Sequence, residues 1–156
     1  MRLIVGLGNP GEKYTNNRHN IGHLVVAELT KKRLPKGFIV KKANCFINQS
    51  GEFVKKLVVQ YNINLSNLWV IHDDLDIPLG SYKIQKGKGP KLHNGINSIE
   101  ETLGTEDFWR VRVGVDNRSP EDRISGEEYV LQDFSEKEMK LLKPVIDEIC
   151  KKLATS

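Results

Sequence analysis

The sequence predicts an α/β fold: one domain, residues 1–156, in which a mixed, mostly parallel central sheet is flanked by helices and followed by a C-terminal helix. Two short runs, Leu3–Val5 and Leu68–Ile71, have the length and continuous hydrophobicity of strands that are buried on both faces. Segments with apolar residues at helical spacing lie between and after them, which is typical of α/β folds. A chain of 156 residues can bury a core of its own, so we expect a single domain.

The other elements follow from apolar spacing and from residues that start or end helices. Pro35 and Gly37 end the first helix, and Ser135 with Glu138 has the spacing of a capping box that starts the last one. Asn94 is of a residue type that caps helices, and we expect it to start the third. In chain order we expect strands at residues 3–5, 37–40, 68–71, 81–85 and 108–115, helices at about 20–33, 53–61, 94–103 and 135–153, and a loop-like segment at 116–126.

Cysteine usage and the start of the chain favour a cytoplasmic protein. Cys45 and Cys150 are far apart and have neither the number nor the spacing of a disulfide framework or a zinc site. The chain opens directly into a strand, without the apolar stretch of a signal peptide or of a membrane span. We therefore expect no secretion and no membrane partner.

The charge distribution mildly favours a polyanionic partner. The chain carries 24 Lys and Arg against 20 Asp and Glu, a net charge of +4. Between Thr30 and Gln60 there are eight basic residues and one acid, and the segment from Gly80 to Gly95 has four lysines and no acid. Lysine runs are also typical of solvated surfaces, and this interpretation stays open on charge alone.

The glycine-rich loop after the first strand resembles a phosphate-binding motif. The segment Gly6-Leu7-Gly8-Asn9-Pro10-Gly11 matches the GxGxxG pattern of dinucleotide-binding enzymes. That motif requires a helix that begins at the loop and an acidic residue at the end of the second strand. Here residues 12–18 are polar without an apolar face, and the second strand ends in Lys41 and Lys42. Those lysines leave an NADP-dependent enzyme as a minor alternative.

His19 and Asp73 are the candidate catalytic pair. A histidine acts as a general base near neutral pH when one ring nitrogen faces water and the other donates to a carboxylate. Asp73 is the first of three carboxylates in the segment 72–76 (HDDLD), which follows a strand that we expect to be buried. A solvated acidic turn or a Mg²⁺ site is the alternative for this segment. Because no serine or cysteine lies in a nucleophile elbow, water is the expected nucleophile.

Three asparagines, Asn9, Asn48 and Asn94, lie in loops at expected strand or helix ends. A side-chain amide can donate to a developing oxyanion and accept from an N–H group without titrating. Each asparagine alone fits an ordinary turn or cap. Together they are more suggestive of such a role.

At this point five segments resemble bacterial-type peptidyl-tRNA hydrolases. They are 3–22 (LIVGLGNPGEKYTNNRHNIG), 46–51 (FINQSG), 70–80 (VIHDDLDIPLG), 93–95 (HNG) and 108–114 (FWRVRVG), in the family's order and across most of the chain. The resemblance implies a single α/β domain that hydrolyses the ester between a peptide and the 3′ ribose of tRNA. Such an ester requires an activated water and an oxyanion donor, so we expect no cofactor and no metal ion.

The resemblance also implies roles for individual residues. His19 is implied to be the catalytic base, with Asp73 as its partner and Asn9 in the same centre. The implied binding residues are Tyr14, Asn48, His93 and Asn94 around the substrate, and Arg112 with the Lys83 to Lys91 cluster at the phosphates of the acceptor end. We expect the acceptor end of peptidyl-tRNA as the partner and a monomeric protein.

Four features depart from the family pattern. Ile47 stands where the family usually has Met, a volume-conserving change. Residues 87–92 are less glycine-rich than in relatives and include Pro90 and Leu92, the segment 30–46 is shortened, and the chain stops at Ser156, short of the usual C-terminal extension. These departures concern RNA contacts and closure of the site more than the hydrolytic centre. A catalytically weak RNA-binding relative of the same fold is therefore the second function class.

Overall fold

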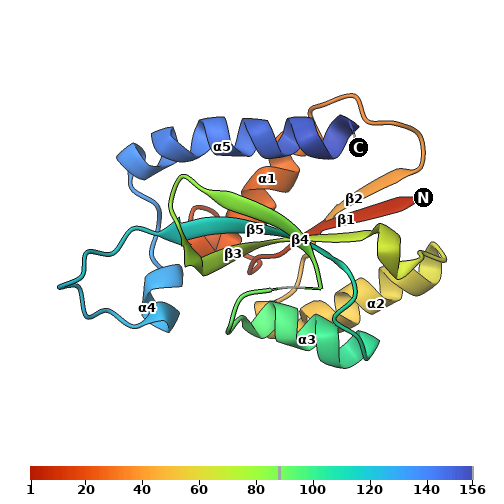
Figure 1. Cartoon of the computed structure of the whole chain (residues 1–156), viewed down its shortest axis with the longest axis horizontal. Helices are drawn as coiled ribbons and strands as arrows, with labels where there is room; N and C mark the ends of the chain where they lie inside the picture. The colour runs from red at the N-terminus through yellow and green to blue at the C-terminus, as the bar shows by residue number, and fades with distance from the viewer. Residues whose placement is uncertain (88, 156) are drawn as a thin grey trace.

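One mixed sheet of five strands forms the centre of the computed structural model, which describes residues 1–87 and 89–155 (Figure 1). The strand order is β2-β1-β3-β5-β4, and every neighbouring pair is parallel except β4 and β5, which are antiparallel. The predicted α/β fold with a mixed, mostly parallel sheet is therefore confirmed. The strands are β1 (Arg2–Gly6), β2 (Phe38–Lys42), β3 (Leu68–Pro78), β4 (Tyr82–Lys86) and β5 (Trp109–Asp116).

Helices cover both faces of the sheet (Figure 1). α1 (Ile21–Leu29) and α5 (Glu136–Thr155) lie on one face, and α2 (Ser50–Gln60) and α3 (Asn94–Leu103) lie on the other. A short helix, α4 (Gly126–Val130), lies beyond the end of the sheet at which the parallel strands finish. Over residues 1–87 and 89–155, no helix is both long and apolar enough to cross a membrane.

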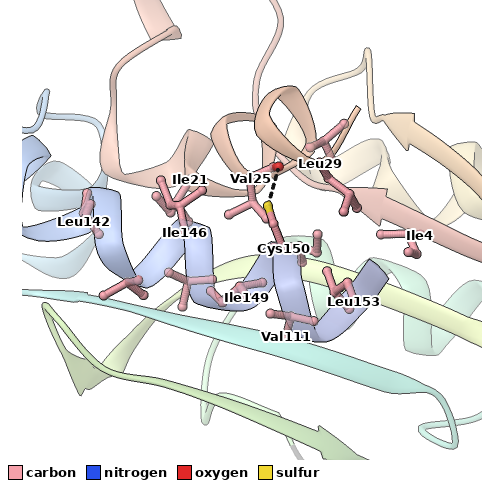
Figure 2. Close-up of a cluster of buried hydrophobic side chains, with 14 of the residues drawn as sticks. Ile4, Ile21, Val25, Leu29, Val111, Leu142, Ile146, Ile149, Cys150 and Leu153 are labelled. Carbon is pink, nitrogen blue, oxygen red and sulfur yellow. Dashed lines mark hydrogen bonds between the residues drawn. The ribbon is translucent and has the colours of Figure 1, made fainter. Parts of the chain in front are cut away.

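Side chains of the central strands alternate between two hydrophobic cores, as the period of a strand requires. Ile4 packs with α1 and α5, whereas Leu3 and Val70 pack with α2 and α3. Figure 2 shows the first core, where apolar residues of α1 and α5 meet over the sheet. Cys150 is part of this core: its Sγ donates to the carbonyl of Val25 at 3.7 Å, and burial raises the pKa of its thiol to about 11.

Two elements end more than two residues away from the predicted position. α1 ends at Leu29 rather than near residue 33, with Thr30 as its C-cap. β3 does not end at Ile71 but continues to Pro78, and its polar residues pair with β5. The expected strand end was therefore wrong, because charged residues within β3 find partners that the sequence pattern does not show. As a result Asp73 lies inside a strand and not in a turn.

The helix caps agree with the prediction in one case and differ in another. α5 begins with the predicted capping box, in which Oγ of Ser135 accepts from the amide of Glu138 at 3.1 Å and Oε1 of Glu138 accepts from the amide of Ser135 at 2.9 Å. α3 begins at Asn94, but the cap is the ring of His93 and not the side chain of Asn94. The predicted cap was wrong by one residue, since histidine is an uncommon residue at this position.

Two adjacent leucines of α5 provide a matched test of the first core. Leu142 is fully buried, whereas Leu141 is 51% exposed. We expect Leu142→Ala to lower the free energy of unfolding by about 3 kcal/mol, because it removes buried methyl groups and leaves a cavity. Leu141→Ala is expected to lower it by less than about 1 kcal/mol. Urea unfolding followed by circular dichroism measures both values, and equal losses would contradict this description of the core.

Candidate active site

A cavity of about 580 Å³ lies where the carboxyl ends of β1 and β3 approach the beginning of α3. This is the edge at which open α/β sheets bind their ligands. Two short 3₁₀ helices, η2 (Arg18–Asn20) and η3 (Ile47–Gln49), and α4 complete its walls. The predicted site residues that line this cavity are Asn9, His19, Asn48, Asp73, His93 and Asn94.

His19 and Asp73 are in direct contact. Nδ1 of His19 lies 2.7 Å from Oδ2 of Asp73, so this nitrogen donates to the carboxylate. Asp73 is 2% exposed, whereas the side chain of His19 is 14% exposed. Within residues 1–87 and 89–155, Nε2 of His19 has no hydrogen-bond partner. The ring therefore keeps one nitrogen available for a ligand in the cavity.

His93 makes the second contact to the same carboxylate. Its Nε2 lies 2.7 Å from Oδ1 of Asp73, and both side chains are almost fully buried. Its other nitrogen, Nδ1, accepts from the backbone amides of Gly95 at 3.1 Å and Ile96 at 3.2 Å. Each oxygen of Asp73 thus faces a different imidazole, and the two rings lie close together, with centroids 5.2 Å apart for His19 and His93.

These contacts shift the two pKa values of the pair in opposite directions. Burial alone would raise the pKa of Asp73, but the charges of His19 and His93 and their hydrogen bonds outweigh burial and hold this pKa far below its ordinary value. Burial alone would lower the pKa of His19, but the charge of Asp73 and the hydrogen bond to it outweigh burial and raise this pKa. The carboxylate therefore stays ionised, and the imidazole can take up a proton near neutral pH.

A further histidine, His72, supports the pair from within the sheet. Its Nδ1 donates to the backbone carbonyl of Asp73 at 2.8 Å, and its ring meets the ring of His93 edge-on, with centroids 5.1 Å apart. Burial, followed by the charge of His93, lowers the pKa of His72 to about 3, so the ring is neutral near neutral pH. The sequence did not assign a role to His72, because only the continued pairing of β3 buries it.

Asn9 is fixed so that its amide NH₂ group remains unused. Its backbone N donates to Oδ1 of Asn20 and its backbone O accepts from Nδ2 of Asn20, both at 2.9 Å. Its side-chain Oδ1 accepts from the backbone amide of Ile47 at 2.9 Å, which assigns the oxygen and nitrogen of this side chain. In the described part of the chain, Nδ2 of Asn9 donates no hydrogen bond. The residue lines the cavity.

Asn48 and Asn94 are exposed and line the same cavity, one in η3 and the other at the first position of α3. Close packing of α2 against α3 holds these two elements together. The amide of Gly51 donates to Oγ of Ser98 at 2.9 Å, and a Cβ atom at Gly51 would lie 2.3 Å from the carbonyl oxygen of Ser98. A larger residue at position 51 would push the two asparagines apart.

The structure adds an apolar rim to the predicted polar site. Phe46, Leu92 and Leu131 line the cavity and are 51%, 80% and 49% exposed, respectively. This rim is not predictable from the sequence pattern, because apolar residues in loops carry no periodic signal. The helix α4 was not predicted either, although Ser125 and Glu128 have the spacing of a capping box and the amide of Glu128 donates to Oγ of Ser125 at 3.2 Å.

Arg18 anchors the segment that carries His19. It is buried, its guanidinium donates to Oε1 of Glu138 at 2.8 Å, and its Cζ atom lies 4.0 Å from the centre of the Tyr129 ring. The same guanidinium donates to the carbonyl of Asp133 at 3.2 Å. Since α5 begins at Glu136 and includes Glu138, these contacts connect η2 with the start of the longest helix.

Three predicted binding residues lie outside the cavity. Tyr14 is half-buried in the 3₁₀ helix Glu12–Tyr14, and Lys83 is exposed on the edge strand β4. Arg112 is buried, with Nε donating to Asp74 and Nη1 donating to Gln85, both at 2.7 Å. Two of its guanidinium nitrogens are therefore engaged within the fold.

One member of the expected lysine cluster, Lys88, lies outside the described residues.

The structure also bears on the alternatives for a cofactor or a metal ion. α1 begins at Ile21 and not at the glycine-rich loop, so the requirement of a dinucleotide site is not met there. Among the described residues, His19, Asp73 and His93 form the group that could hold a metal ion, with ligand atoms within 4.8 Å of one another. Nδ1 of His19 and Nε2 of His93 each lie 2.7 Å from an oxygen of Asp73, which is the distance of a direct hydrogen bond.

Comparison with known proteins points to one family. A family model described as peptidyl-tRNA hydrolase matches residues 3–36 and 30–156. The peptidyl-tRNA hydrolases of Lawsonia intracellularis and Corynebacterium efficiens are each 39% identical to this chain, over 90% and 87% of it and over 79% and 84% of their own lengths. A crystal structure of peptidyl-tRNA hydrolase in complex with N-propanol has a TM-score of 0.83 and 27% identity, over 99% of this chain and 87% of that one.

The family match covers nearly the whole chain, and the same fold recurs in the solved structure. The chain belongs to the peptidyl-tRNA hydrolase family.

Proposed function

We propose that the protein hydrolyses the ester between a peptidyl, or N-blocked aminoacyl, group and the 3′ ribose of tRNA, and so releases free tRNA for translation. The observation that carries the proposal is the contact of His19 with the buried carboxylate of Asp73 in a cavity that is open to a ligand. Family membership supplies the substrate class. We also propose that the protein acts as a monomer.

The proposed base is Nε2 of His19. It removes a proton from a water molecule as the water oxygen attacks the ester carbonyl, while Nδ1–H donates to Asp73 and stabilises the imidazolium. The imidazolium then gives this proton to the 3′ oxygen of the ribose as the bond from the acyl carbon to that oxygen breaks. The products are a peptide carboxylic acid and a tRNA with a free 3′ hydroxyl. General-base assistance of this kind contributes ~10²- to 10⁴-fold.

We assign the oxyanion to Asn9. Its Nδ2 is an amide donor without a partner in the described residues, while its Oδ1 is fixed by the backbone amide of Ile47. A donor whose orientation is fixed before the substrate arrives stabilises developing charge without reorganisation. Asn48 and Asn94, which line the same cavity, are then free to position the acyl group and the attacking water.

The proposed contact to the tRNA backbone lies at the edge of the sheet. Lys83 is exposed on β4, and since it pairs directly with Arg112 of β5, it points to the face of the sheet that α3 covers. In the chain, residues 90–93, which line the cavity, lie between β4 and α3. An exposed lysine there gives a phosphate contact that weakens with salt.

Replacement of His19 tests whether the protein is an enzyme or a weakly active RNA-binding relative. We expect His19→Ala to reduce hydrolysis of N-acetyl-aminoacyl-tRNA by about 10²-fold or more, because the water loses its base. Release of the labelled acyl group measures the rate, and filter binding measures tRNA affinity, which is expected to persist. Wild-type activity no greater than that of His19→Ala would favour the RNA-binding relative.

Asp73→Asn tests the partner of His19 through the pH dependence. Since the pKa of His19 is raised and the base must be neutral, wild-type kcat/KM is expected to fall as pH decreases through an apparent pKa above about 6.5. Asp73→Asn removes the charge that raises this pKa, so the acidic limb moves to lower pH, while kcat falls by about 10²- to 10⁴-fold. KM is expected to change little. An unchanged acidic limb would show that another group titrates.

Lys83→Ala tests the contact to the tRNA backbone. We expect a higher KM, an unchanged kcat, and a salt dependence of binding that is smaller by about one unit of slope, because one phosphate contact is lost. Lys36→Ala is the matched control, since Lys36 is also exposed but lies beside the start of β1, at the opposite end of the strand from the cavity. Equal effects of the two substitutions would assign the salt dependence to overall charge.

A further inference from the structure

We propose that His93 is a positioning residue, which connects the N-terminal amides of α3 to the carboxylate of Asp73 and so fixes Asp73 for its contact with His19. The catalytic meaning of this inference rests on the proposed function. The positions of the protons on the rings of His93 and His19 do not depend on the proposed function and can be tested separately.

The helix cap determines which nitrogen of His93 carries the proton. Nδ1 lies 3.1 Å from the amide of Gly95 and 3.2 Å from the amide of Ile96, and both amides can only donate. Nδ1 must therefore offer a lone pair, and the single proton of the neutral ring is on Nε2. A proton on Nδ1 would remove the cap from two N–H groups at the buried start of α3.

The proton on Nε2 of His93 points at Asp73. The distance from Nε2 to Oδ1 is 2.7 Å, and the two side chains are 4% and 3% exposed, so no bulk water competes for this bond. A carboxylate that accepts from only one donor can rotate, so that its two oxygens exchange positions. With Oδ1 held by His93, Oδ2 is left facing Nδ1 of His19. That contact in turn leaves Nε2 of His19 as the free base.

Neighbouring groups hold the ring of His93 in this orientation. His72 meets it edge-on, with centroids 5.1 Å apart, and donates to the backbone carbonyl of Asp73. Gly95 allows the close approach of the helix, since a Cβ atom at this position would lie 3.0 Å from Cε1 of His93. The titratable and charged groups around Asp73 are His19, His72 and His93, with Arg110 next to His72. His93 is the one that contacts both the helix and the carboxylate.

Donation from His93 also moderates the effect of Asp73 on His19. A carboxylate that accepts a second hydrogen bond shares its charge between two donors. Loss of the His93 bond leaves more of this charge to the His19 imidazolium, which then holds its proton to higher pH. The two ring nitrogens of His93 therefore have separable consequences, one for α3 and the other for the pH dependence of hydrolysis.

Two substitutions separate these consequences. In His93→Asn, Oδ1 can take the place of the Nδ1 acceptor at the helix cap, but the side chain ends before the Nε2 position. In His93→Gln, Nε2 can take the place of the ring donor to Asp73, but the acceptor of the cap is lost. His23→Gln is the matched control, because the buried ring of His23 donates from Nε2 to the carbonyl of Ala43 and does not contact Asp73.

We expect the acidic limb of kcat/KM for N-acetyl-aminoacyl-tRNA to move up by about 0.5 pH unit or more in His93→Asn, with kcat at least about 10-fold lower. The limb is expected to stay within about 0.2 unit of wild type in His93→Gln and in His23→Gln. An unmoved limb in His93→Asn, or the same shift in His93→Gln, overturns the inference. Wild-type turnover that does not depend on His19 overturns the proposed function instead.

A measurement on the wild-type protein depends neither on the folding of a variant nor on turnover of a substrate. Long-range ¹H–¹⁵N correlation spectra of the histidine rings report which nitrogen carries a proton. We expect the Nε2–H tautomer for His93, and for His19 a proton on Nδ1 that stays there when Nε2 loses its proton. A proton on Nδ1 of His93 would overturn the inference whatever the activity of the protein.

Discussion

The arrangement of the cavity depends on one buried charge, the carboxylate of Asp73. An ionised carboxylate that is almost inaccessible to water is very costly unless its oxygens accept hydrogen bonds. Both oxygens do, one from His19 and one from His93, which lie in segments far from β3 in the sequence. The need to satisfy this charge therefore explains why three separate segments meet at one point of the sheet edge. The same contacts keep Asp73 ionised and leave His19 with one free nitrogen, so a requirement of folding also prepares the base.

Other buried charges hold the segments that carry these residues. Arg18, the residue before His19, pairs with Glu138 at the start of α5. On β3, the buried Asp74 accepts from Arg112 of β5. The exposed Asp76 is not part of a buried pair, but its Oδ2 accepts from the backbone amide of Lys91 and so ties the segment before His93 to the strand. Removal of one partner from a buried pair leaves an uncompensated charge, so each pair resists displacement of its segment. The two histidines are thus placed by contacts that are themselves outside the reacting centre.

The sequence predicted the features that depend on local pattern, and it missed those that depend on burial. Apolar runs such as Leu68–Ile71 were sufficient for the strands, and the spacing of Ser135 and Glu138 was sufficient for a helix start. The order of the motifs was sufficient to pair His19 with Asp73, and in the structure the two side chains are 2.7 Å apart. The continuation of β3 through its acidic residues could not be predicted, because the pairing residues of β5 are distant in the sequence. For the same reason Arg112 was expected at phosphates, whereas Asp74 and Gln85 hold its guanidinium within the fold.

His19 and His93 share the carboxylate of Asp73, and the positions of their protons are fixed, which makes Nε2 of His19 the base. Neutron diffraction from a deuterated crystal at a pH above the acidic limb of kcat/KM tests this arrangement most directly, because it locates the protons. We expect deuterium on Nδ1 of His19 and on Nε2 of His93, each directed at an oxygen of Asp73, with none on Nε2 of His19 or on Nδ1 of His93. Deuterium on Nε2 of His19 with Nδ1 bare, or on an oxygen of Asp73, would contradict it.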